Sequence, residues 1–347
     1  MIHIKISEQD IEIIKQIWCK WFFRKNRIDE IIDILDKDIT FRKMIFLCDR
    51  EYYAWKYKYA LRPERSKEKK LREKICEFIF DELSDEKKVV KKYRRNIQEG
   101  TKQFILKTYE NYRKSAALCE IIDKMGIEVC PYCNRNFLER YASGNKKYFK
   151  GDLDHHYSKD EMPALAISFY NLVPSCKVCN HEKGETRKRT FYPFYDYEDK
   201  EYHFSLELYE DNDEKDIIYG KAIENIEKKR FDLTVWQGIS DNFNIRLRGV
   251  DETNLSEHME NSKEIFRLEQ KYNHTKGYVK ELIRKKYIYP QIYKDNLLNK
   301  FKDIFENEEE LFETFYSYSD SEEYLLNRPL SKLTKDVLEQ IKELDSE

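Results

Sequence analysis

Two Cys-x-x-Cys pairs are the part of this sequence whose residue types and spacing most restrict the chemistry. Cys130 and Cys133 form the first pair, and Cys176 and Cys179 form the second. Two residues between cysteines allow both thiolates of one tight turn to reach a single tetrahedral ion at about 2.3 Å per bond. Four thiolates leave no open coordination position. The two pairs therefore predict one structural zinc ion, Zn²⁺, in preference to a redox role for either pair.

The segment between the pairs contains residues that suit hydrolysis. Residues 148–155 are predicted to form a strand that ends in Asp154 and His155. Neighbouring residues of a strand point to opposite sides of the backbone. One of these two side chains can therefore bind a cation while the other faces a substrate.

A second strand and a helix are predicted to follow, over residues 171–175 and 177–188. Asn180 is expected in the first turn of that helix, where its amide oxygen can be held against the same cation as the Asp154 carboxylate. Oxygen ligands of this kind suit Mg²⁺ or Mn²⁺ better than zinc. The sequence thus predicts a catalytic metal site beside the structural zinc.

Three histidines are candidates for the base that such a site needs. Hydrolysis of a phosphodiester requires an activated water, and a cation to neutralise the charge that grows on the phosphate. His155, with an ordinary pKa of about 6.5, can act as that base at neutral pH. His156 and His181 are the rivals. The simpler interpretation of His156 is a supporting or surface group, and that of His181 is a solvent-facing helix residue, so His155 is preferred.

The combination of Asp154, His155, Asn171 and Asn180 with the flanking cysteine pairs resembles the HNH endonucleases, also called ββα-metal or His-Me finger nucleases. The resemblance implies that His155 is the general base. It also implies that Asp154 and Asn180 hold one divalent cation on the scissile phosphate. Asn171, by the same resemblance, braces the loop that carries the histidine.

Three longer segments resemble a narrower family. Residues 130–136, 166–176 and 328–336 are similar to the HNH nuclease subunit of Septu-type and retron-associated bacterial anti-phage systems. This resemblance implies a DNA-cutting effector in antiviral defence. It also implies a partner ATPase of the ABC/SMC-like class.

Two alternatives stay open at this stage. An RNA-cutting effector, for example one that acts on tRNA, is a close alternative because the metal site attacks a phosphate and does not itself read the sugar. A non-catalytic zinc module that binds nucleic acid or a partner protein would need only the cysteines. The presence of Asp154, His155 and Asn180 together disfavours this second alternative.

Two groups of basic residues are candidates for contacts with a phosphate backbone. The favoured group lies toward the end of the predicted catalytic helix, so that it must be near any bound phosphate chain. It comprises Lys183, Arg187, Lys188 and Arg189. A solvated helical face explains the other group at least as well, because four acidic residues precede it. That group comprises Lys87, Lys88, Lys91, Lys92, Arg94 and Arg95.

The composition predicts a soluble, cytoplasmic protein with no membrane contact. Charged residues make up 37% of the 347 residues, but the formal net charge is −2, so overall charge argues neither for nor against nucleic acid. No apolar run resembles a signal peptide or a membrane span. In the cytosol, cysteines favour metal ligation or buried thiols over disulfides. Core thiols are therefore predicted for the remaining cysteines, Cys19, Cys48, Cys76 and Cys119.

The apolar pattern predicts a mainly α protein with a small α+β insert. Residues 1–125 carry helical apolar stripes and are predicted to form an N-terminal helical domain, whose first helix Ser7 can cap. Residues 126–195 are predicted to form the zinc-braced nuclease core. Residues 196–347 are predicted to form a mixed and then helical region.

Two features are expected within that last region. Apolar and polar residues alternate around residues 202–208 and again around 245–247, which predicts a few antiparallel strands. The final helix carries an apolar stripe over residues 333–344. Such a stripe is typical of an intramolecular core, and a partner-binding face is the alternative.

Overall fold

A computed structural model provides the structure of the chain. It describes residues 1–25, 28–61, 65–94, 96–195, 202–208, 232–249, 255–289, 291–301, 304–305, 307–316, 318–319 and 322–344. Arg95 of the predicted basic run lies outside the described residues.

Helices make up most of the described chain, as the sequence predicts. The first helices are α1 (Glu8–Lys25), α2 (Ile28–Lys37), α3 (Ile39–Ile45), α4 (Asp49–Leu61), α5 (Arg65–Ile79), α6 (Glu86–Tyr93), α7 (Glu99–Arg113) and α8 (Ala116–Met125). Ser7 Oγ accepts a hydrogen bond from the backbone N–H of Asp10 (3.0 Å), which caps α1. Ile14, Trp18 and Phe22 of α1 are buried, so the predicted stripe faces the core.

Short antiparallel pairs of strands interrupt the helices. The pairs are β1 (Arg140–Ser143) with β2 (Lys146–Phe149), β3 (Asp152–His155) with β4 (Leu172–Ser175), and β5 (His203–Leu208) with β6 (Phe243–Arg248). The last pair confirms the strands expected from alternation. In the second pair, Asp154 lies opposite Val173 and His155 opposite Leu172.

The predicted strand over residues 148–155 is wrong in its extent. The chain leaves β2 after Phe149, where the backbone N–H of Lys150 donates to the Glu139 carbonyl (2.8 Å). After Gly151 the next strand begins at Asp152 and pairs with β4 instead of β1. A change of pairing partner requires a break between the two strand pairs, and the break falls at Lys150 and Gly151.

The helix predicted over residues 177–188 is also shorter than predicted. Helix α9 runs over Lys177–Lys183 and ends at Gly184, whose φ of 49° is a conformation that glycine adopts easily. The prediction of a helix to residue 188 is therefore wrong. Asn171 is not part of a strand but ends the short 3₁₀ helix η2 (Phe169–Asn171), directly before β4.

The C-terminal part of the described chain is again helical. Its helices are α10 (Glu257–Ile265), α11 (Leu268–Asn273), α12 (Lys276–Ile288), α13 (Gln291–Lys300), α14 (Glu308–Tyr316), α15 (Glu322–Asn327) and α16 (Ser331–Leu344). Leu333, Val337 and Ile341 of α16 are buried. Asp336 accepts a hydrogen bond from the backbone N–H of Phe204 in β5 (2.8 Å), so the stripe of α16 belongs to the intramolecular core.

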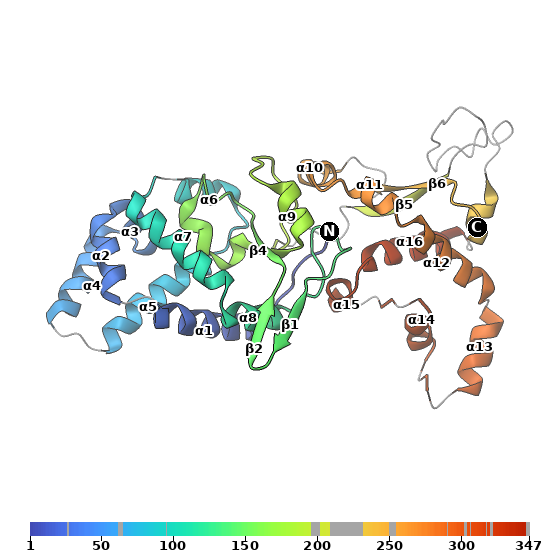
Figure 1. Cartoon of the computed structure of the whole chain (residues 1–347), viewed down its shortest axis with the longest axis horizontal. Helices are drawn as coiled ribbons and strands as arrows, with labels where there is room; N and C mark the ends of the chain where they lie inside the picture. The colour runs from blue at the N-terminus through green and yellow to red at the C-terminus, as the bar shows by residue number, and fades with distance from the viewer. Residues whose placement is uncertain are drawn as a thin grey trace.

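The chain is elongated, and β1 to β4 lie between its two helical ends (Figure 1). The N-terminal segment lies against this centre, because the backbone N–H of Ile2 donates to the Pro131 carbonyl (2.7 Å). From the other end of the chain, the Leu326 carbonyl accepts a hydrogen bond from the backbone N–H of Val129 (3.0 Å). The centre is therefore built from segments far apart in the sequence.

Asn134, directly after the first cysteine pair, joins the cysteine loop to α16. Its φ of 45° lies in the left-handed region, which Asn tolerates better than most residues. Its Oδ1 accepts from the backbone N–H of Lys332 (3.0 Å) and from Ser331 Oγ (3.1 Å), and its Nδ2 donates to the Leu325 carbonyl (2.9 Å). These contacts link the two segments that the family resemblance singles out, residues 130–136 and 328–336.

The cysteines outside the pairs only partly follow the prediction of core thiols. Cys119 is a buried free thiol, as predicted. Cys19 and Cys76 form a disulfide, because α1 and α5 pack with these residues facing each other at a Cα–Cα distance of 6.7 Å. Cys48 is exposed because it lies in the bend between α3 and α4. The core-thiol prediction is therefore wrong for these three.

Among the residues that the structure describes, no helix combines the length and the apolar character that crossing a membrane requires.

Candidate metal centre and active site

Four buried cysteines converge at the centre of the molecule. Cys130 and Cys133 lie in the turn before β1, and Cys176 and Cys179 lie at the end of β4 and in the first turn of α9. Their sulfur atoms all lie within 4.8 Å of one another. The structure thus brings together the four predicted zinc ligands.

The cluster fits a zinc ion in size and chemistry. Four zinc–sulfur bonds of about 2.3 Å place neighbouring sulfur atoms about 3.8 Å apart in a tetrahedron, and Cys133 Sγ lies 3.9 Å from Cys176 Sγ. Asn136 Nδ2 (3.2 Å) and the Cys179 backbone N–H (3.5 Å) donate to Cys176 Sγ. Hydrogen bonds within the cluster, first with Cys130, lower the pKa of Cys176 and favour a thiolate there. These four side chains could hold a zinc ion.

Asp154 lies on the face of β3 that α9 covers, and it is buried. Its carboxylate accepts hydrogen bonds from the Tyr132 hydroxyl (2.6 Å) and from Lys183 Nζ (3.0 Å). Lys183 Nζ also donates to the His155 carbonyl (2.7 Å). Tyr132 belongs to the first cysteine pair and Lys183 to α9, so this carboxylate is held between the cysteine loop and the helix.

Lys183 therefore does not contact a nucleic-acid backbone in this conformation, contrary to the prediction. Its side chain is 5% exposed because it lies on the face of α9 that packs against β3. An ammonium buried there pairs with the nearest carboxylate, that of Asp154. The charge of Lys183 alone suggested a surface residue. Its position on the buried face of α9 instead pairs it with Asp154.

Asp152 lies two residues before Asp154 and on the same face of β3. Asn180 Nδ2 donates to Asp152 Oδ2 (3.1 Å), and Arg113 of α7 forms an ion pair with the same carboxylate (3.0 Å). Asn180 thus contacts Asp152, while Asp154 contacts Lys183. The two predicted cation ligands lie on the same interface between β3 and α9 but are not bonded to each other.

His155 points to the other side of β3, as strand alternation predicts. Its Nε2 lies 3.2 Å from the Ala166 carbonyl, and its ring lies 4.5 Å from that of Tyr109 in α7. Since a carbonyl only accepts, this contact places the proton on Nε2 and leaves the Nδ1 lone pair as the basic position. Burial lowers the pKa of His155 to about 4, although the Ala166 carbonyl opposes the shift. The side chain is therefore neutral at pH 7.

Asn171 holds the loop that follows His155. Its Oδ1 accepts from the backbone N–H of Tyr157 (2.7 Å), and its Nδ2 donates to the carbonyls of Tyr157 (3.1 Å) and Leu165 (3.0 Å). The side chain thus spans the loop from both ends. This geometry agrees with the bracing function that the resemblance implies.

The rival histidines have different surroundings. The His156 ring stacks on Tyr192 with centroids 4.3 Å apart, and burial lowers the pKa of His156 well below 6.5. Its buried Nδ1 has no hydrogen-bond partner among the described residues. His181 is exposed on α9, as predicted.

The remaining predicted backbone contacts are already paired with carboxylates. Arg187 pairs with Glu161 (3.1 Å) and Lys188 with Glu264 (3.1 Å). Arg189 pairs with Glu86 of α6. These basic side chains are exposed, so a phosphate chain would compete with surface ion pairs of low strength. Their assignment to nucleic-acid binding stays a prediction.

Sequence reasoning missed two polar members of this centre, Asp152 and Tyr132. The signal for Asp152 was available, because residues i and i+2 of a strand share a face and Asp154 was already a candidate. Tyr132 lies between two zinc ligands and gives no local sign that its hydroxyl reaches Asp154. Only the packing of the cysteine loop against β3 makes that contact.

Comparison of the chain with protein-family models, with curated proteins and with solved structures finds no match.

Proposed function

We propose that this protein is a metal-dependent endonuclease of the HNH, or ββα-metal, type that hydrolyses phosphodiester bonds in DNA. One observation carries the proposal: the β3–β4 hairpin and α9 hold Asp152, Asp154 and Asn180 at one interface, and β3 ends in His155. The four-cysteine cluster lies at the start of α9 and supports the same arrangement. Oxygen ligands and a neutral histidine are the groups that phosphodiester hydrolysis requires.

His155 takes the proton from the attacking water in this proposal. The Ala166 carbonyl fixes the tautomer, so that Nδ1 receives the proton. Burial keeps the imidazole neutral at physiological pH, and the charge of an approaching phosphate would raise the pKa of His155 and strengthen it as a base. Asn171 keeps the chain after His155 in place while the proton moves.

Asp154 and Asn180 are the proposed ligands of Mg²⁺ or Mn²⁺, with Asp152 beside them. Such a cation, when bound, neutralises the charge that develops on the phosphate and on the leaving oxygen. Lys183 holds the Asp154 carboxylate in the described conformation, and Asn180 turns its amide nitrogen to Asp152. Cation binding therefore requires Lys183 to leave Asp154, and the Asn180 amide to rotate so that its oxygen faces inward.

The cellular part of the proposal depends on the motif resemblance alone. We propose that the nuclease acts in bacterial anti-phage defence and that an ABC/SMC-like ATPase controls its access to DNA. Cutting of RNA, for example tRNA, is an alternative outcome of the same chemistry.

Cleavage assays test the proposal. Labelled double-stranded DNA, single-stranded DNA and tRNA are incubated with Mg²⁺ or Mn²⁺ and either wild type, His155→Ala or the matched control His181→Ala. We expect cation-dependent cutting of DNA that His155→Ala abolishes and His181→Ala leaves intact. Selective cutting of tRNA would establish the RNA alternative. Cutting that persists in His155→Ala would show that another residue is the base.

A second candidate function is a non-catalytic zinc module that binds nucleic acid or a partner protein. The observation that favours it is the buried ion pair between Lys183 and Asp154, which satisfies the carboxylate without any metal ion. If neither cation promotes cutting of any substrate, with or without an added ATPase partner, this second function would replace the first.

A further inference from the structure

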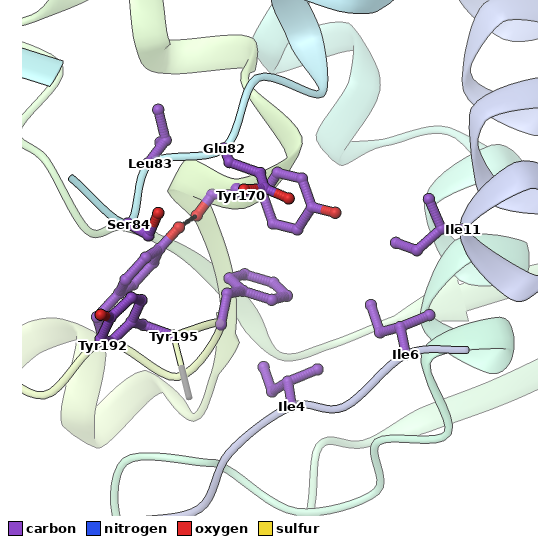
Figure 2. A pocket seen from close by; sticks show the side chains of 10 residues that line it. Ile4, Ile6, Ile11, Glu82, Leu83, Ser84, Tyr170, Tyr192 and Tyr195 are labelled. Carbon is purple, nitrogen blue, oxygen red and sulfur yellow. Dashed lines mark hydrogen bonds between the residues drawn. The ribbon is translucent and has the colours of Figure 1, made fainter. Parts of the chain in front are cut away.

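A cavity of about 310 Å³ lies beside the candidate site, between segments that are distant in the sequence. Figure 2 shows Ile4 and Ile6 of the N-terminal segment on one side, Glu82 and Ser84 on another, and aromatic side chains between them. Its volume falls within the range of small-molecule sites. It is large enough for a planar ring system.

Four of the ten residues that line the cavity are aromatic, and contacts among them hold their rings in place. The Tyr192 hydroxyl donates to the Tyr170 carbonyl (2.8 Å). The Tyr170 ring meets the Phe194 ring edge-on, with centroids 5.5 Å apart and an interplanar angle of 88°. Tyr192 is buried, whereas Tyr195 at the rim is 39% exposed. The cavity thus has an aromatic side and an accessible rim, which suits stacking of a flat ring.

The rim also carries a carboxylate. Glu82 and Ser84 are exposed residues of the segment between α5 and α6 and line the cavity. No ion pair of Glu82 occurs among the described residues. Glu82 and Tyr170 both line the cavity, and the pKa of Tyr170 is raised, first by burial and then by the charge of Glu82. A negative charge at this position repels phosphate and accepts hydrogen bonds from N–H groups.

The cavity is connected to the candidate site through two residues. Tyr192 forms part of its wall and stacks on His156, the neighbour of His155. Tyr170 forms another part and precedes Asn171, which braces the loop after His155. A ring bound in the cavity would therefore lie next to the end of β3, with its attached backbone outside.

We propose that this cavity binds one unpaired guanine base of the nucleic-acid substrate. The base would stack on the aromatic wall, as single-stranded bases do on exposed aromatic side chains. Guanine is the base whose pairing edge presents two adjacent N–H donors, N1–H and the 2-amino group, which match the two oxygens of Glu82. This inference rests on the proposed function, because it assumes a nucleic-acid substrate.

Binding of short oligonucleotides tests the guanine site without any cleavage. Fluorescence anisotropy is measured with labelled thymidine oligonucleotides that carry one central guanine, hypoxanthine or thymine, in the absence of Mg²⁺ and Mn²⁺. Hypoxanthine lacks only the 2-amino group. We expect the guanine oligonucleotide to bind at least about fivefold more tightly than the other two, as one bidentate contact provides.

Three variants separate the contributions of the wall and the rim. Glu82→Gln should remove the preference for guanine, and Tyr170→Ala should weaken binding of all three oligonucleotides. Glu120→Gln, an exposed residue of α8 that does not line the cavity, should behave as wild type. Equal affinity of wild type for the three oligonucleotides, or an unchanged preference in Glu82→Gln, would overturn the proposal.

The failure of this inference is distinguishable from the failure of the proposed function. If the guanine preference depends on Glu82 but no substrate is cut, the base site stands and the nuclease assignment falls. If DNA is cut in a His155-dependent manner without any guanine preference, the nuclease assignment stands and the base site falls.

Discussion

The two polar clusters to which α9 contributes are built in opposite ways. The first turn of the helix contributes Cys179 to four sulfur atoms that lie within 4.8 Å of one another. The following residues contribute Asn180 and Lys183 to the carboxylates of Asp152 and Asp154. The first cluster consists of ligands alone, whereas the second already contains its own cations, Lys183 and Arg113.

This difference indicates different tasks. Soft thiolates in a closed, buried arrangement suit a permanent zinc ion that stabilises the fold. Carboxylates that are paired with protein cations can either keep those partners or exchange them for a metal ion. The sulfur cluster is therefore suited to a structural task, and the carboxylate cluster is suited to a change of partner.

The largest expected effect comes from removal of a zinc ligand. Cys176→Ala should lose zinc and unfold the centre, because the binding free energy of a structural zinc, about 10–16 kcal/mol in zinc-finger peptides, is folding free energy. Zinc content and thermal unfolding measure this. Cys48→Ala, which changes an exposed cysteine, is the control and should melt as wild type. A Cys176→Ala protein with wild-type stability would show that the sulfur cluster binds no structural metal.

A smaller effect is expected in the carboxylate cluster. Lys183→Met leaves the buried Asp154 carboxylate without its cation and should cost about 3–5 kcal/mol of unfolding free energy. Mn²⁺ should restore part of that loss in Lys183→Met and add little to wild type, because the ion can replace the ammonium. Urea unfolding with and without Mn²⁺ measures both. Lys177→Met, on the exposed side of the same helix, is the matched control.

Two results would count against this account of the carboxylate cluster. Equal stability of Lys183→Met and Lys177→Met would show that the buried pair contributes nothing. An equal effect of Mn²⁺ on both variants would show that the ion binds elsewhere.

The link from the cysteine loop to α16 should contribute less. Asn134→Ala removes hydrogen bonds to residues 325, 331 and 332 and places alanine at a φ of 45°. We expect a loss of about 1–3 kcal/mol in urea unfolding, with zinc retained. Asn134→Gly keeps the backbone conformation and loses only the side-chain bonds, so it should be less destabilised. Loss of zinc in Asn134→Ala would show that the sulfur cluster depends on α16.

The smallest expected effect is a shift of the pH dependence of cleavage. Because burial lowers the pKa of His155 to about 4, the neutral base persists well below its ordinary limit near 6.5. The rate at low substrate concentration, which reports the free enzyme, should therefore stay level from pH 8 to about 5 and fall as the pH approaches 4. A half-maximal rate near pH 6.5 would show that His155 is solvated in the free enzyme.

Much of the centre was predictable from local pattern. The spacing of the cysteine pairs identified the four sulfur ligands, and strand alternation separated Asp154 from His155. The apolar stripe of α1 and its Ser7 cap were equally predictable, because helix periodicity and capping depend on residues only a few positions apart. The break at Gly151 was missed because it depends on which segment pairs next. The end of α9 was missed although Gly184 was a local signal for it.

The sequence by itself determined the ligand types, the helical stripes and the alternation of β3, because these follow from chemistry and short-range geometry. Only the tertiary structure decided that Lys183 pairs with Asp154, that Cys19 joins Cys76, and that Asn134 caps the start of α16. Each of these contacts brings together residues that are remote along the chain. Burial then selects the partner, because a buried charge or polar group must be satisfied by whatever the packing places beside it.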